Sequence, residues 1–135
     1  MDSLKFIKSA LETRLKAMPN GLATAWENVS FDPPAEAYQR ADMLPAAPEN
    51  PTLGDGFYRE RGLFQITLFY PLDGGGGVVY AMAEAVRSWF PRGLSLVSGG
   101  VTVRIPSTGA IGPHFRENDR FALPVRIRYF ADIVQ

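Results

Sequence analysis

The first candidate for a chemical role is a run of glycines, Gly74 to Gly77. It lies between a stretch with the periodicity of a strand and a stretch with the periodicity of a helix. Glycine-rich loops before helices can bind phosphate through backbone N–H groups. A Walker loop also needs a lysine and a Ser or Thr after its last glycine, where this chain has Val78 and Val79. The dinucleotide fingerprint GxGxxG fails too, because its third glycine would fall on Val79 or Tyr80. We therefore interpret the run as a flexible strand-to-helix connection.

The other reactive side chains do not form a catalytic constellation in the sequence. His114 is the only histidine, so a histidine-rich metal site is impossible. Ser107 and Thr108 lie near it, but neither has the GxSxG elbow of a serine hydrolase around it. The acidic residues lack the paired spacing of a metal loop. We expect no catalytic residue, no metal and no cofactor.

The composition limits the class of protein further. The 135 residues fit one domain, 1–135. Fourteen basic and fourteen acidic side chains cancel, which argues against nucleic acid as the main partner because tight phosphate binding needs a basic surface. The absence of cysteine excludes disulfides and thiolate metal sites. No apolar run approaches the ~20 residues of a membrane span. The first residues lack the apolar core of a secretory signal, so we expect synthesis in the cytoplasm.

Two stretches have the periodicity of amphipathic helices. Residues 3–18 repeat apolar side chains three and four apart, with most charged residues on the other side. Residues 78–90 repeat them at every fourth position and end before Pro91-Arg92-Gly93. Both are predicted to cover a core.

Period-two patterns predict strands at 37–44, 57–70, 101–105 and 121–130, with a further short candidate at 24–29. Pro124 places the last strand at an edge or in a bulge, because proline cannot donate to a strand ladder. Residues 45–56 and 106–118 are predicted to be loops. The strands come in adjacent pairs, in the order α-β-β-α-β-β. This order predicts an α+β fold, a mainly antiparallel sheet of four to five strands with two helices packed on one face.

Arginines are concentrated on or beside the predicted strands, where several would share the sheet face opposite the helices. Arginine suits interfaces because its guanidinium forms bidentate pairs and its stem packs on aromatic rings. The alternatives are a solvated outer face and, less consistent with the neutral charge, a nucleic-acid surface. The 45–56 loop is predicted to project and to order against a partner. The predicted oligomer or partner interface consists of Leu53, Phe57, Arg59, Arg61, Phe69, Arg126, Arg128 and Phe130.

The order and spacing of several segments resemble small phage tail-terminator-like proteins, a family sometimes catalogued as a phage-related domain of unknown function. The resemblance covers about residues 4–127. It is carried by the opening helix, TAWENVSFDPP, LPAAPENPTLGDG, RGLFQITLFYPLDGGGG, the helix ending in FPRG, and GGVTVRI. The family is similar in architecture to the tail terminator, a minor tail protein, of lambda-like siphophages.

The resemblance implies a structural protein of the virion or of a prophage remnant, without enzymatic activity or cofactor. Such proteins form a homo-hexameric ring that caps the tail tube, stops its polymerisation and offers a surface for head joining. The implied partners are further copies of the chain, the major tail tube protein and a head-completion or neck protein, with neither membrane nor sequence-specific nucleic acid. The implied location is the virion tail, after assembly in the host bacterial cytoplasm. The alternatives are a neck or head-tail connector subunit, or a small nucleotide-binding or enzymatic domain that uses the Gly74–Gly77 loop.

Overall fold

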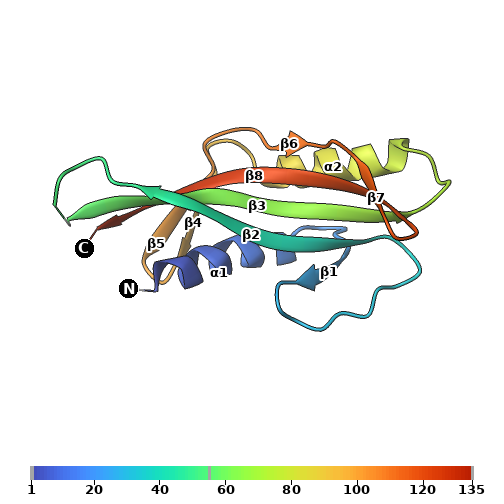
Figure 1. Cartoon of the computed structure of the whole chain (residues 1–135), viewed down its shortest axis with the longest axis horizontal. Helices are drawn as coiled ribbons and strands as arrows, with labels where there is room; N and C mark the ends of the chain where they lie inside the picture. Colours follow the sequence, from blue (N-terminus) through green and yellow to red (C-terminus); the bar gives the residue numbers. More distant parts are fainter. Residues whose placement is uncertain (1, 55, 135) are drawn as a thin grey trace.

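A computed structural model describes residues 2–54 and 56–134 of the chain (Figure 1). It contains two helices, α1 (Ser3–Lys16) and α2 (Gly77–Trp89), and eight strands. The strands are β1 (Ala23–Trp26), β2 (Tyr38–Glu49), β3 (Phe57–Pro71), β4 (Ser95–Ser98), β5 (Val101–Arg104), β6 (Ala110–Ile111), β7 (Phe115–Glu117) and β8 (Arg120–Val134).

All eight strands belong to one sheet, in which β3 and β8 form the long central pair. The order is β1-β2-β3-β8-β5-β4, and β6 and β7 also pair with β8. The register of β3 and β8 runs from Phe57 opposite Val134 to Pro71 opposite Arg120, over fifteen residues of each strand. The pairing of β1 with β2 is parallel and the other pairings are antiparallel. The sheet is therefore mixed.

The alternation along β3 determines which face of the sheet is covered. Phe64, Ile66 and Leu68 point to one face and are fully buried, as the period-two pattern predicts. Both helices pack their apolar stripes into the same core, so they cover the same face of the sheet. The helical members of this core are Ile7, Ala10, Leu11, Leu15, Val79, Ala83 and Val86.

The two helices are also joined directly near their C-terminal ends. The Arg14 guanidinium donates to the Trp89 carbonyl from Nε (3.0 Å) and Nη2 (2.8 Å). The Trp89 indole N–H in turn donates to the Arg14 carbonyl at 2.6 Å. The guanidinium carbon lies 3.8 Å from the indole ring centroid, a cation–π distance. The Trp89 carbonyl, in the last turn of α2, thereby gains two donors, while the Arg14 carbonyl also accepts from the Ala17 backbone N–H at 3.2 Å.

Two glycines are required by close packing. An added Cβ at Gly62 in β3 would lie 2.5 Å from the Leu44 carbonyl oxygen and 2.6 Å from the Tyr129 hydroxyl. The Tyr129 side chain thus packs against the backbone of Gly62, in space that the Cβ of any other residue would occupy. Burial of this tyrosine, reinforced by nearby acidic charges, raises its pKa to about 12. In the β4–β5 turn, Gly99 has φ of +56° and a Cβ there would lie 2.3 Å from the Phe6 ring of α1.

The predicted α+β class and the two helices are confirmed, but the strand count of four to five and the predicted order of the elements are wrong. The sheet was predicted to be mainly antiparallel, and it contains one parallel pairing, that of β1 with β2. Strands β4, β6 and β7 were not predicted, because they have only two to four residues each. The predicted 45–56 loop is also too long, because β2 continues to Glu49 despite Pro45 and Pro48. This continuation is possible since β1 pairs only with residues 38–41, so the rest of β2 is an edge strand.

The edge of β2 beyond its contact with β1 offers few free donors. The Met43 backbone N–H points away from β3 and donates to the Glu27 carboxylate. Pro45 lies two residues further along, on the same side of the strand, and has no N–H. Pro124 in β8 is accommodated similarly, because it lies between the short β6 and β7, where the neighbouring strand is interrupted. The predicted edge position applies only to this one residue, because β8 as a whole lies between β3 and β5 in the sheet.

Candidate protein-binding site on the open face of the sheet

The sheet face opposite the helices, here called the outer face, is covered by the chain itself at one end. Tyr38 stacks on Phe69 with ring centroids 4.9 Å apart. Arg120 holds the β1–β2 connection over them by donating to the Glu36 carbonyl at 2.8 Å and the Pro34 carbonyl at 2.5 Å. Phe69 is consequently only 1% exposed. Phe69 lies on the outer face, as predicted. Because it is covered, it is unavailable to a partner in this conformation, and it lies apart from the other predicted interface residues.

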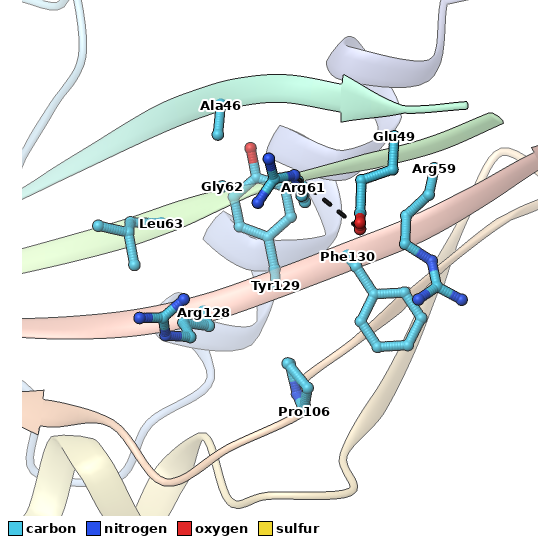
Figure 2. Close-up of a pocket in the computed structure, with 10 residues that line it drawn as sticks. All are labelled: Ala46, Glu49, Arg59, Arg61, Gly62, Leu63, Pro106, Arg128, Tyr129 and Phe130. Carbon is cyan, nitrogen blue, oxygen red and sulfur yellow. Dashed lines mark ion pairs between the residues drawn. The ribbon is translucent and has the colours of Figure 1, made fainter. Parts of the chain in front are cut away.

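The other half of the outer face is open and contains a hollow of about 390 Å³, here called the arginine hollow (Figure 2). The β3–β8 register creates it by placing Arg61 opposite Phe130 and Leu63 opposite Arg128. The side chains of these four residues alternate with buried ones and therefore share the outer face. The lining residues are Ala46, Glu49, Arg59, Arg61, Gly62, Leu63, Pro106, Arg128, Tyr129 and Phe130.

Arg59 is held rigidly at one side of the arginine hollow. Its Nε and Nη2 donate to the two carboxylate oxygens of Asp132 at 2.7 and 3.1 Å, a bidentate pair. Its guanidinium carbon also lies 4.3 Å from the Phe130 ring centroid. The hydrogen bond to Asp132 raises the pKa of Arg59 above its ordinary value, although burial acts in the opposite direction. On the other side of β8, Arg104 of β5 is the strand partner of Phe130, and its guanidinium donates to the Ser95 hydroxyl at 3.0 Å.

The remaining arginines differ in how strongly the chain engages them. Arg61 donates to the Ala47 carbonyl at 3.0 Å, and its Nε lies 3.9 Å from Glu49 Oε1 (dashed in Figure 2). Arg126 is tied down by bonds to Gln65 Oε1 (3.0 Å) and the Gly112 carbonyl (2.7 Å). Arg128 is exposed and, among the residues that the structure describes, has no hydrogen bond or ion pair. It is the cation of the hollow that is free to bind a partner.

Two predicted interface residues lie beyond the arginine hollow, toward the β2–β3 connection. Phe57 is half-buried and lines a smaller adjoining hollow of about 260 Å³ with Glu49, Pro51 and Arg59. Leu53 projects fully into solvent from this connection. The structure thus brings together Arg59, Arg61, Arg128 and Phe130, with Arg126 and Phe57 beside them. The burial of Phe69 and the projection of Leu53 separate those two from the group.

Sequence reasoning missed six of the ten lining residues, Ala46, Glu49, Gly62, Leu63, Pro106 and Tyr129. Leu63 could have been predicted, because the period-two alternation of β3 places it on the same face as Arg61 and Gln65. Glu49 and Pro106 carry no local signal. They reach the hollow through the extension of β2 and through the segment after β5.

The features that first suggested chemistry lie outside the arginine hollow. The glycine loop turns through positive φ at Asp73 and Gly75, and α2 begins at Gly77. His114 stacks on Phe121 with centroids 5.0 Å apart and is exposed. Within residues 2–54 and 56–134, no three His, Asp or Glu side chains gather as a metal site would require. No helix in the same residues is long and apolar enough to cross a membrane.

The fold and this face define an α+β protein whose mixed sheet carries helices on one side and an open, arginine-lined half on the other. Over residues 6–129, the chain matches the family described as phage tail terminator protein. A solved structure is also similar over the whole fold, with a TM-score of 0.79 and 30% sequence identity; the alignment covers 100% of this chain and 99% of that one. None of the curated proteins compared with the chain matches it. The chain therefore belongs to the phage tail terminator protein family, whose role is structural.

Proposed function

We propose that this protein is a tail terminator that assembles into a homo-hexameric ring on the end of the tail tube. The ring stops the addition of tube subunits and provides the surface to which the head is joined. The observation that carries the proposal is the family match over residues 6–129, which includes every element from α1 to most of β8. On this proposal, the protein assembles in the cytoplasm of the host bacterium and remains in the virion tail.

The open half of the outer face supports a role in protein binding. Fixed arginines beside a half-buried aromatic ring resemble the composition of protein interfaces, where arginine and aromatic residues are enriched. The neutral net charge fits a protein that must associate with itself, because long-range repulsion between copies is small. The proposed partners are other copies of the chain, the major tail tube protein and a head-completion or neck protein.

The proposal is tested by electron microscopy of tail tubes. Tube protein that polymerises in vitro is mixed with this protein, and tube lengths and tube ends are compared with tubes grown without it. We expect rings of six subunits at tube ends and growth that stops when the protein is added. Bovine serum albumin at equal concentration is the control. Unchanged tube lengths, with no density added at the tube ends, would contradict the proposal. Deletion of the gene from an active phage should correspondingly abolish the control of tail length.

A further inference from the structure

The two ends of the outer face carry opposite charge. Four guanidinium groups stand in and beside the arginine hollow against two carboxylates, a net charge of +2. These are Arg59, Arg61, Arg104 and Arg128 against Glu49 and Asp132. Two of the four arginines already pair with these carboxylates, so the excess is carried by Arg104 and Arg128. This end of the sheet can accept an acidic partner.

At the opposite end, the β7–β8 turn and the β1–β2 connection come together (Figure 1). Six carboxylates there stand against three guanidinium groups, a net charge of −3. They are Asp32, Glu36, Asp42, Asp73, Glu117 and Asp119 against Arg40, Arg116 and Arg120. Glu117 is paired with Arg40 at 3.1 Å. The Asp119 side chain, at the tip of the turn, is 91% exposed. Its carboxylate lies 4.0 Å from Arg120 Nε, a long distance for an ion pair, so it is free to bind another group.

We propose that the arginine hollow of one copy receives the β7–β8 turn of a second copy, with the Asp119 carboxylate bound by the Arg128 guanidinium. This proposal rests on the proposed ring, and it identifies the contact between neighbouring copies in that ring. Arg128 is the exposed cation of the hollow that has no partner among the described residues, and Asp119 is the carboxylate at the tip of the β7–β8 turn, with a side chain that is 91% exposed. A guanidinium can bind a carboxylate through two parallel hydrogen bonds, and the half-buried Phe130 ring adds an apolar wall to the hollow.

The position of the two groups gives the contact a direction. Each copy has its basic region near the C-terminal part of β8 and its acidic turn before the first residue of β8, at opposite ends of the molecule (Figure 1). A contact between unlike patches at opposite ends can repeat head to tail, so that each copy uses each of its patches once. Such an assembly becomes a ring when its rotation closes. A two-fold dimer would also use both patches of each copy, and the mass measured by light scattering distinguishes that dimer from a ring.

Charge reversal tests the contact directly. Arg128→Glu and Asp119→Arg are prepared as single variants, as a double variant and as an equimolar mixture of the two singles. Light scattering after size-exclusion chromatography measures the assembly of each. We expect each single variant to weaken association on the order of tenfold or more, because like charges then face each other. The double variant and the mixture should both regain assembly, since every junction again joins opposite charges.

Arg92→Glu is the matched control, because it makes the same charge change at an exposed position after α2. It should assemble like the natural chain. Circular dichroism and thermal melting establish that every variant folds. If the natural chain assembles and both single variants assemble equally well, or if the double variant and the mixture do not recover, this contact is wrong while the ring remains. If the natural chain does not assemble even with tail tubes present, the proposed function itself fails.

Discussion

Replacement of Gly62 by alanine tests the packing of β3 against β8. The new methyl group would lie 2.5 Å from the backbone oxygen of Leu44 and 2.6 Å from the hydroxyl of Tyr129. Neither neighbour can move cheaply, because the first belongs to a paired strand and the second is 2% exposed. Overpacking costs roughly 1–3 kcal/mol, and a methyl on a strand glycine recovers only about 0.5–1 kcal/mol of backbone entropy.

We therefore expect Gly62→Ala to lower the free energy of unfolding by about 1–2 kcal/mol, or Tm by roughly 3–8 °C for a chain of this size. Urea denaturation followed by circular dichroism measures the change. Gly77→Ala is the control, since a Cβ there meets nothing within 4 Å, and it should not destabilise the protein. On a Tyr129→Phe background the cost of Gly62→Ala should shrink, because the nearest side-chain atom is gone. An unchanged midpoint for Gly62→Ala would refute the reasoning.

Three further predictions concern the packing of the helices and the buried tyrosine. The pKa of Tyr129 is raised to about 12, so the unfolded phenol loses its proton first and stability should fall by up to about 3 kcal/mol as pH rises from 10 to 12. Urea titrations across this range should show a smaller loss for Tyr129→Phe, and equal losses would contradict the assignment. Arg14→Ala should cost roughly 1–2 kcal/mol in urea denaturation, because two hydrogen bonds to the Trp89 carbonyl and the ring contact disappear; a change of a few tenths would show that the link contributes little. Gly99→Ala should cost about 2 kcal/mol or more, since it combines a positive φ with a clash against Phe6, and a melting temperature equal to that of the natural chain would exclude the clash.

The long elements of the fold were predictable because their periodicity extends over many residues. The apolar alternation of β3 extends from Phe64 to Tyr70, and the buried positions of α1 recur from Ser3 to Leu15, so chance matches are improbable. The two- to four-residue strands have no such redundancy. One of them did carry a signal, since Gly99-Gly100 joins two short apolar runs and both glycines have positive φ, as a two-residue hairpin turn requires.

The site was predictable only in part, because its residues lie on strands whose register the sequence does not specify. The phase of β3 and β8 correctly placed Arg61, Arg128 and Phe130 on one face. The same phase included Phe69, which is buried because the β1–β2 connection folds over it. That covering depends on Arg120 reaching carbonyls more than eighty residues earlier in the chain. Local patterns contain no information about such a contact.

The edge of β2 has a consequence for how the subunit behaves before it meets a tail. Open strand edges hydrogen-bond to the edges of other molecules, and this is a common route to aggregation. Here Glu27 occupies the Met43 donor, and Pro45 has none to offer. Two successive outward-facing positions of this stretch therefore present no free backbone donor, which disfavours edge-to-edge pairing between concentrated subunits.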